Sequence, residues 1–479
     1  YFVELPQLLW SGANLAWQFF TIEDKVHKFM KIYQDMFDKY HKYDFNSARS
    51  HDLVDVYYEL ENGVLRNWKA PIVNDFMAMI FYGILRMLIE KWGLNEDGGS
   101  LQNELVAGQG DVESTLPLKK LQQIARFIKT DAALVDLFKT SGEEKLAEIF
   151  VYAARSDYSE NQKKLCLMIA DYLEEFGYRS MNELKLEVPP LMDKPQFVFS
   201  ILKNYTACNL PENDGSSSHE KDLREKAEKL VTEKLSGHRM FGVISKLAVF
   251  NFIVNNTKRA VAFREYQRFA RTKMFGLARR IFVGIGHRLV DFKVIDHADD
   301  VFYLTKDEIF SYVVGTATIQ NLRELIALRK KEYDAYEKGE ELPDRIETFG
   351  PVYCNDLNVP AEAPAAEENA DPDLMNGLSC CPGVVRGKVK VILTPSDDMS
   401  LNGEILVAGR TDPGWVPLYP SASGLLIERG SILSHSAIVA RELGLPAIVG
   451  INNITKKLKT GDEVEMDGAK GTIRIVNRA

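Results

Sequence analysis

One stretch organises the C-terminal part of the chain: Gly424-Leu-Leu-Ile-Glu-Arg-Gly-Ser-Ile-Leu-Ser-His-Ser-Ala-Ile-Val-Ala-Arg-Glu-Leu-Gly-Leu-Pro-Ala-Ile-Val-Gly450. Its two ends are short apolar runs of strand length, and the segment between them carries helix start and stop signals. Ser434 or Ser436 can cap a helix, Gly444 suits the position after its end, and Pro446 prevents its continuation. The stretch therefore predicts a strand, a loop, a helix of about two turns and a second strand.

His435 stands at the N-terminal end of the predicted helix. Unpaired backbone N–H groups and the positive end of the helix dipole gather there, so a phosphate on this side chain would be stabilised. A neutral imidazole is a nucleophile near pH 7, and a phosphorylated imidazole can pass its phosphoryl group on. Ser434 and Ser436 could donate hydroxyl hydrogen bonds to the phosphate. A lone histidine in a first turn is more often structural, so the surrounding motif decides the interpretation.

That motif extends over about the last hundred residues. Apolar residues alternate with others around Val389, and further short apolar runs follow at 405–407, 464–466 and 472–476. The apolar residues of this segment therefore recur with a period of two, whereas those of the preceding part of the chain recur at helical spacing. The segment predicts a small β/α domain.

The whole segment resembles the phosphorylation-site region of the phosphoenolpyruvate-utilising enzymes. Cys381-Pro-Gly-Val-Val-Arg-Gly-Lys-Val389 is similar to the family's opening strand, Thr411-Asp-Pro-Gly-Trp-Val-Pro417 to its middle loop, and Gly461-Asp-Glu-Val-Glu-Met-Asp-Gly468 to its closing hairpin. One departure is Ser431, where the family commonly has Gly or Ala. The resemblance covers residues 376–477 and implies a swivelling domain that carries a phosphoryl group on His435.

The resemblance also implies the surroundings of the phosphate and its source. We expect Thr411, together with Ser434 and Ser436, to stabilise the phosphate. ATP and Mg²⁺ would be bound outside this chain, by an ATP-grasp nucleotide-binding domain supplied in cis or as a separate subunit. The sequence itself has no P-loop, and Gly284-Ile-Gly falls inside a helical pattern, where a dinucleotide fingerprint has no meaning.

The rest of the chain divides at a change of composition. From Leu8 to about Lys331 apolar residues recur at helical spacing. Residues 355–373 then contain three prolines, six acids and no basic residue, which is typical of a stiff, solvated tether. We therefore predict a multidomain protein: a large all-α acceptor-binding domain over 1–354, a tether over 355–373 and a small β/α swivelling phosphohistidine domain over 374–479.

The domain order favours one branch of the family. Phosphoenolpyruvate synthases and pyruvate phosphate dikinases follow the swivelling domain with a pyruvate-binding barrel, whereas this sequence ends at Ala479. Rifampin phosphotransferases end with the swivelling domain and precede it with a helical acceptor domain. Four segments here look like that helical domain: Asn74-Asp-Phe76, Arg264-Glu-Tyr266, Asp300-Val-Phe-Tyr-Leu304 and Arg329-Lys-Lys-Glu-Tyr333. The partner expected for His435 is accordingly a small hydroxyl-bearing acceptor.

Two groups of residues are candidates for the acceptor side. Arg264, Arg268 and Arg271 share one helical face with Arg279, and this stripe could neutralise charge during transfer or be an ordinary solvated, ion-paired face. The loop 108–115 offers Asp111 and Glu113 as general bases for an acceptor hydroxyl, or merely caps the helix that follows.

Composition excludes several classes of protein. A net charge of −9 argues against nucleic-acid binding, and the apolar runs are too short and too interrupted by charge to predict a membrane span. The cysteines have no metal-ligand spacing, so we expect no metal site, and the first residues lack the order of a secretion signal, so we expect a cytoplasmic location. The sequence predicts a dikinase-type phosphotransferase, with a non-catalytic phosphohistidine relay as the alternative.

Overall fold

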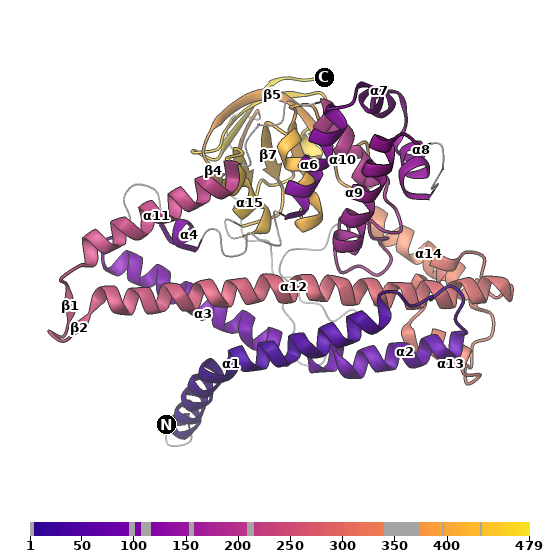
Figure 1. Ribbon diagram of the computed structural model, residues 1–479, viewed down its shortest axis with the longest axis horizontal. Coiled ribbons are helices and arrows are strands. Elements are labelled where there is room, and N and C mark those ends of the chain that lie inside the picture. Colours follow the sequence, from indigo (N-terminus) through magenta and orange to yellow (C-terminus); the bar gives the residue numbers. More distant parts are fainter. Residues whose placement is uncertain are drawn as a thin grey trace.

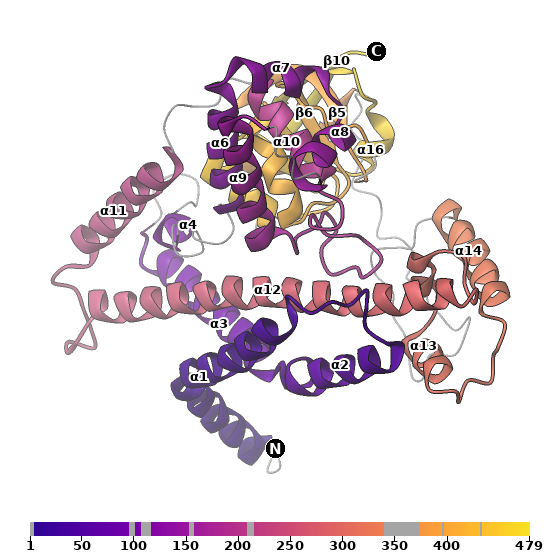
Figure 2. The same ribbon diagram turned by 45° about the vertical axis from the view of Figure 1, so that its right-hand side comes forward.

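The computed structural model describes residues 4–94, 101–106, 116–152, 158–207, 215–339, 373–394, 397–431 and 434–479. The long helix α12 lies across the middle of the molecule, with α1 and α2 on one side of it and the sheet with helices α6 to α10 on the other, while α3 crosses α12 (Figures 1 and 2). The loop 108–115 and the predicted tether, except Asp373, lie outside the described residues.

The helices along α12 form a part that we call the helical base, residues 4–106 and 215–339. Its α12 has 46 residues and is therefore roughly 70 Å long at the rise of an α-helix. A short β1–β2 hairpin precedes it, and the Ser245 hydroxyl caps its first turn by accepting from the Ala248 N–H. The elements of the base are α1 (Glu4–Tyr40), α2 (Ser50–Gly63), η1 (Leu65–Asn67), α3 (Lys69–Lys91), α4 (Leu101–Val106), α11 (Gly215–Leu235), β1 (Arg239–Met240), β2 (Ile244–Ser245), α12 (Lys246–Asp291), η3 (Ala298–Tyr303), α13 (Lys306–Val313) and α14 (Leu322–Lys338).

Two glycines of α12 have a packing role. A Cβ on Gly284 would lie 2.7 Å from the carbonyl oxygen of Phe45, and one on Gly286 would lie 2.3 Å from that of Ala298. Only glycine lets the neighbouring backbones approach this closely. The prediction that Gly284-Ile-Gly lies in a helix is confirmed.

A second group of helices lies beside the sheet, on the same side of α12 (Figures 1 and 2). Ser159 and Gln162 form a capping box at the start of α9, and Asp131 caps α7, which explains these helix starts. The group contains α6 (Leu116–Lys129), α7 (Ala132–Thr140), α8 (Glu143–Ala147), η2 (Glu148–Tyr152), α9 (Glu160–Phe176) and α10 (Gln196–Ala207).

The C-terminal residues 374–479 form a β/α unit that we call the carrier domain. Its sheet has the strand order β3-β10-β9-β5-β6-β7-β8-β4, in which β5, β6, β7 and β8 are parallel neighbours and the other pairings are antiparallel. The predicted strands are confirmed. The elements are β3 (Leu374–Asn376), β4 (Leu378–Cys381), β5 (Val384–Val391), β6 (Ile405–Ala408), η4 (Pro413–Ser421), β7 (Gly424–Ile427), α15 (His435–Leu443), β8 (Ala447–Val449), α16 (Ile454–Lys457), β9 (Glu463–Asp467) and β10 (Thr472–Asn477).

The central strands are buried on both faces, which explains their continuous apolar runs. Along β7, Leu425 and Ile427 enter one cluster of buried apolar residues, whereas Leu426 enters another on the opposite face. The second cluster is completed by α16 and the β9–β10 hairpin. The first is completed by α15 and η4, and it continues without a break into α6, α9 and α10. The apolar core of the carrier domain is therefore shared with helices more than 160 residues earlier in the sequence.

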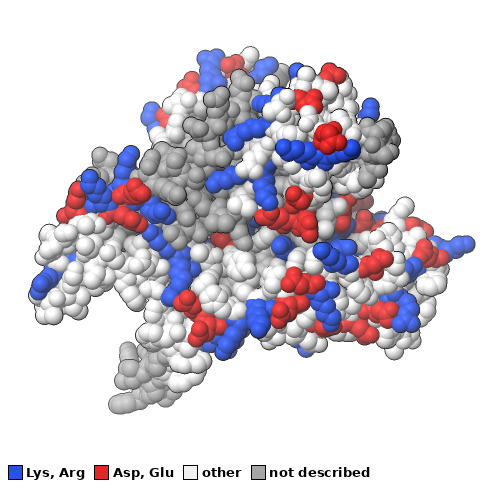
Figure 3. All heavy atoms as spheres, viewed as in Figure 1, with Lys and Arg blue, Asp and Glu red and all other residues white. Residues whose placement is uncertain are grey.

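The base has its own buried clusters. One joins α1, α2 and the C-terminal half of α12 with α13 and α14, and the other joins α3, α4 and α11 with the N-terminal part of α12. Within the described residues, one stretch, Ser50–Lys91, has the length and composition of a membrane span. It comprises α2 to α3, whose inner faces contribute to both clusters, and we interpret it as a core element. On the face shown in Figure 3, acidic and basic side chains are interspersed.

Candidate active site

The parallel arrangement of β6 and β7 brings two loops together. Carboxyl ends of neighbouring parallel strands meet at one edge of a sheet, and ligands of α/β sheets bind there. The loop after β6 carries Thr411 and Asp412, and the loop after β7 leads to α15. Backbone hydrogen bonds from Glu428 N–H to the Ala408 carbonyl and from Arg429 N–H to the Gly409 carbonyl, 3.0 and 2.9 Å, hold the loops side by side.

Helix α15 has the form that its sequence predicts. It begins at His435 and ends at Leu443, and the Ser434 hydroxyl caps it by accepting from the Ala437 N–H. Gly444 follows in the left-handed conformation, with φ of 63°, which favours glycine. The predicted position of His435 at the helix start is confirmed for its backbone, while its side chain lies outside the described part of the structure.

Two predicted phosphate-stabilising hydroxyls contact each other. Thr411 Oγ1 and Ser436 Oγ form a short hydrogen bond between the β6 loop and the first turn of α15. Because this bond joins the loop to the helix, the two hydroxyls position the start of α15. Ser436 is buried, and it lies next to Tyr419, whose pKa is raised by burial to about 12 against the opposing effect of the Ser436 and Thr411 hydroxyls. Ser434 is only half-buried, and its hydroxyl proton remains available to donate.

Asp412, next to Thr411, is a buried carboxyl that the sequence analysis missed. It accepts hydrogen bonds from the Gly414 N–H at 2.8 Å and from the Asn182 N–H at 2.6 Å, the latter across from the loop between α9 and α10. Burial, with a further effect of the nearby Glu183 carboxylate, raises its pKa to about 6. The carrier domain thus meets that loop through an acid that titrates close to neutral pH.

Glu183 connects this edge of the carrier domain with α12. Its side chain is 7% exposed, and it lies 3.8 Å from the Arg179 guanidinium. On the other side it accepts a hydrogen bond of 3.4 Å from the Thr272 hydroxyl of α12 and acts electrostatically on Arg271. Polar groups therefore run from the start of α15 through Asp412 and Glu183 to α12.

Three predicted acceptor-side residues are brought together around Asp75 of α3. Arg264 lies 3.5 Å from the Asp75 carboxylate, and Arg268 and Arg271 act on the same carboxylate. Burial raises the pKa of Asp75, and all three arginines oppose this effect. Burial, followed by the charge of Arg268, lowers the pKa of the half-buried Arg271 guanidinium. Asp111 and Glu113 lie outside the described residues.

The fourth arginine of the predicted stripe has a different environment. Arg279 is 4% exposed, and its guanidinium pairs with Asp299 at 2.8 Å and Asp193 at 3.5 Å. A buried cation held by two carboxylates and by the Leu186 carbonyl is a structural group. The interpretation of Arg279 as part of a stripe that neutralises charge during transfer, or of a solvated face, is therefore wrong. Helical spacing predicts which residues share a face of the helix, but not what packs against that face.

Asp412 makes a prediction about pH. The folded chain binds a proton on this carboxyl with a pKa of about 6, against an ordinary value of 3.8. Between about pH 4 and 6 the folded state therefore holds more protons than the unfolded state, so the free energy of unfolding should fall as the pH rises, by up to about 3 kcal/mol, and stay level above pH 6. Urea unfolding followed by tryptophan fluorescence across this range measures the effect.

Two variants test this pH dependence: Glu183→Gln changes a charge that acts on Asp412, and Glu160→Gln is the control. Removing the Glu183 charge lowers the pKa of Asp412, so the fall should become smaller and move to lower pH. Glu160 has a 91% exposed side chain in a surface pair, and its variant should follow the wild type. An identical pH dependence in Glu183→Gln and wild type would contradict the assignment.

The sequence carried only a faint signal for the missed residues. Asp75 lies in the Asn74-Asp-Phe76 segment and Asp412 in the Thr411 motif, so both were inside recognised segments. Among the residues that the structure describes, no group of three or more His, Cys, Asp or Glu is gathered as a metal site. Hydroxyls, helix N–H groups and arginines are instead the groups that hold a phosphoryl anion.

Two family models match this chain. Residues 401–471 match the mobile domain of the PEP-utilising enzymes, and residues 71–265 match the fourth domain of rifampicin phosphotransferase. The first match contains the whole site at the edge of β6 and β7, and the second contains Asp75 and Arg264. The resemblance to the phosphoenolpyruvate-utilising enzymes is therefore confirmed.

Individual relatives point the same way. Rifampicin phosphotransferase of Bacillus subtilis is 29% identical over 314 residues, which cover 64% of this chain and 34% of that protein. The enzyme of the same name from Bacillus cereus is 27% identical over 388 residues, which cover 79% of this chain and 40% of that enzyme. Phosphoenolpyruvate synthase of Aeropyrum pernix is 45% identical over 118 residues, which cover 24% of this chain and 14% of that enzyme. The chain thus spans about two fifths or less of these relatives.

Proposed function

We propose that this chain carries a phosphoryl group on His435 from ATP to a hydroxyl-bearing acceptor bound at the helical base. The observation that best supports this is the polar connection from Thr411 and Ser436, through Asp412 and Glu183, to Arg271 and its neighbours on α12. It joins the carrier site to a group of arginines, and such cations stabilise a phosphoryl group during its transfer.

The donor half of the reaction uses the start of α15. ATP with Mg²⁺, held by a nucleotide-binding part outside these residues, would supply the phosphoryl group. The imidazole of His435 would form the new P–N bond as the P–O bond to the nucleotide breaks. The helix N–H groups and the Ser434 hydroxyl would then hold the phosphate, while the Thr411–Ser436 contact fixes the helix start.

The acceptor half would use the arginines and Asp75. An acceptor hydroxyl would attack the phosphorus, forming a P–O bond as the P–N bond to His435 breaks. Arg268 and Arg271 would neutralise the charge on the transferring group, and the Asp75 carboxylate, or Asp111 or Glu113, would take the hydroxyl proton. Asp75 suits this role because burial raises its pKa towards that of a useful base.

The donor half predicts that the chain acquires labelled phosphate from ATP only when an ATP-grasp partner is present. Incubated alone with ATP carrying labelled phosphate, the 479-residue chain should stay unlabelled. Adding an ATP-grasp partner from the same system should give an acid-labile, base-stable label, as a phosphoramidate does. Efficient hydrolysis of ATP by the chain alone would contradict the proposal.

The fate of that label separates an enzyme from a relay. A phosphotransferase should lose the label to a small hydroxyl compound, which is found by chromatography of the low-molecular-weight fraction. A phosphohistidine relay should pass it to a protein instead. The two outcomes are distinguished on the same labelled sample.

The acceptor half predicts that one variant changes the second step of the reaction, transfer to the acceptor, without changing the first, labelling of the chain. Arg271→Gln should leave labelling of the chain by the ATP-grasp partner unchanged and slow loss of the label to the acceptor by about 100-fold, because one charge-stabilising group is removed. Arg386→Gln, which alters a surface arginine paired with Glu463 on the carrier domain, is the control and should affect neither step. Equal losses in both steps for Arg271→Gln would argue for a merely structural role.

A further inference from the structure

We infer that the β1–β2 hairpin of the helical base inserts its tip into the interfacial layer of a lipid bilayer that carries anionic headgroups. The hairpin tip is defined as residues 240–244. It lies at the end of the base where α12 begins, and it projects away from the carrier domain (Figure 1). The contact is peripheral and spans no membrane, and it is independent of the proposed function.

The hairpin tip displays large apolar side chains to solvent. Phe241 is 91% exposed, Val243 78% and Ile244 51%. Singly exposed apolar residues are common on protein surfaces, whereas a contiguous apolar patch marks a site of interaction. Three such side chains within four residues of one projecting turn form a patch of this kind.

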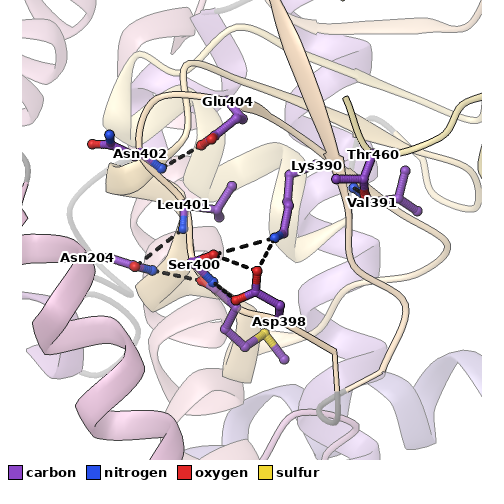
Figure 4. A network of polar contacts seen from close by, with 10 residues as sticks. Asn204, Lys390, Val391, Asp398, Ser400, Leu401, Asn402, Glu404 and Thr460 are labelled. Carbon is purple, nitrogen blue, oxygen red and sulfur yellow. Dashed lines mark hydrogen bonds and ion pairs between the residues drawn. The ribbon is translucent and has the colours of Figure 1, made fainter. Parts of the chain in front are cut away.

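A loop of the carrier domain shows how apolar loop residues are packed elsewhere in the chain. Met399 and Leu401 of this loop are almost fully buried. The Asn204 side chain of α10 donates to the Met399 carbonyl at 2.9 Å and accepts from the Leu401 N–H at 3.3 Å (Figure 4). Within the described residues, nothing covers the hairpin tip to a similar extent.

The backbone of Phe241 adds a second observation. The Val243 N–H donates to the Met240 carbonyl at 3.1 Å and closes a turn in which Phe241 and Gly242 have φ angles of 50° and 74°. Turns with positive φ at both central positions favour Asn or Asp before glycine. A phenylalanine is strained there, and its exposed ring gains almost no packing that would offset the strain. Neither the turn nor the core therefore explains an aromatic residue at this position.

The charge around the hairpin tip complements an anionic surface. Residues 236–264 include no acid, although the whole chain has a net charge of −9. The exposed His238 and Arg239 precede the tip, and Lys246 follows it. In Figure 3 the far left-hand end of the molecule, where the hairpin lies, is white and blue without red. Basic residues beside an apolar tip are attracted to anionic headgroups while the apolar side chains enter the lipid.

The size of the patch favours a bilayer over a protein partner. With about 150–200 Å² for each whole side chain, the exposed parts of Phe241, Val243 and Ile244 come to roughly 400 Å². A stable protein interface takes about 800 Å² from each partner, so the hairpin tip is too small to hold a second copy of this chain or another protein. Interfacial attachment needs an insertion of only about 5–10 Å, which a turn of this size can reach.

A second apolar part of the base projects from the molecule. No charged residue occurs from Leu5 to Ile22, and Trp10 and Trp17 in this part of α1 are more than half exposed. Tryptophan is enriched where proteins meet the boundary between lipid and water. Figures 1 and 2 show the hairpin and the N-terminal end of α1 both projecting away from the carrier domain. Attachment at this side of the base would leave the carrier domain turned towards water.

Cosedimentation of the whole 479-residue chain with lipid vesicles tests the inference. The vesicles contain phosphatidylcholine with phosphatidylserine, or phosphatidylcholine alone. The chain should bind the mixed vesicles more tightly, and added salt should weaken that binding. Phe241→Asn should lower the affinity for the mixed vesicles at least about tenfold, because one large apolar side chain no longer enters the lipid. Arg239→Gln should lower it about fivefold and leave binding to phosphatidylcholine alone unchanged.

Two features of the variants separate a lost contact from a lost fold. Phe241→Asn places in the turn a residue that favours its conformation, so the thermal midpoint should stay level or rise. Tyr336→Ser removes an aromatic side chain on α14 that is 82% exposed, and it should bind vesicles like the wild type.

The remaining outcomes overturn the inference. They are a wild-type chain that binds neither kind of vesicle, a Phe241→Asn variant that binds like the wild type, and an equal loss in Tyr336→Ser. Analytical ultracentrifugation without lipid covers the protein alternative: a dimer that Phe241→Asn dissociates would make the hairpin tip a contact between copies of the chain. Because none of these measurements uses ATP or an acceptor, failure of the proposed function would leave them unaffected.

Discussion

Replacing His435 with Ala or Asn should reduce phosphoryl transfer to background, since the imidazole nitrogen is the only group at the start of α15 proposed to carry the phosphate. The fold should remain intact, because Ser434 supplies the helix cap and Gly444 its end. The measurement is incorporation of label from ATP in the presence of the ATP-grasp partner, with the thermal midpoint recorded for each variant.

The control for this prediction is another histidine. His51 of α2 has a 68% exposed side chain in a surface pair with Asp55, and His51→Asn should label like the wild type. Labelling of His435→Asn near the wild-type level, with a normal thermal midpoint, would remove the phosphohistidine from the mechanism.

Trp415→Ala should lower the free energy of unfolding by about 3–5 kcal/mol, the range found for truncating a large buried aromatic side chain. Trp415 is 1% exposed and packs in the core shared by the carrier domain and α6 to α10. Urea unfolding of the whole chain measures the loss. Because the residue serves both segments, protection of backbone amides from hydrogen exchange should fall in α10 as well as in β7.

Trp10→Ala is the matched control. Trp10 lies on α1 with 70% of its surface exposed, so its loss should change the free energy of unfolding by no more than about 0.5 kcal/mol. Unchanged hydrogen exchange in α10 of the Trp415 variant would mean that the carrier domain has a core of its own.

The sequence predicted the carrier domain well because its signals are local. Ser434, Gly444 and Pro446 mark the bounds of α15 by backbone chemistry that needs no partner, and short apolar runs mark β6, β7 and β8. The same runs could not tell one face of the sheet from the other, since both faces are buried.

What the sequence could not predict depends on distant partners. Arg279 and Arg271 share a helical face, yet one is held by Asp193 and Asp299 and the other lies near Glu183. Asp412 becomes a weak acid only because a loop some 230 residues earlier covers it. Such pairings follow from tertiary packing, which periodicity does not contain.

The shared core also has a consequence for how the chain is made. Helices α6 to α10 emerge from the ribosome well before η4 and the carrier sheet that complete their core. Until then, the side chains of α10 that face η4, such as Tyr205, lack the partners that the carrier domain supplies. Long-range contacts of this kind form late and leave intermediates that are prone to aggregate. A chain truncated before residue 374 should therefore accumulate in the insoluble fraction and depend on chaperones for any that stays in solution.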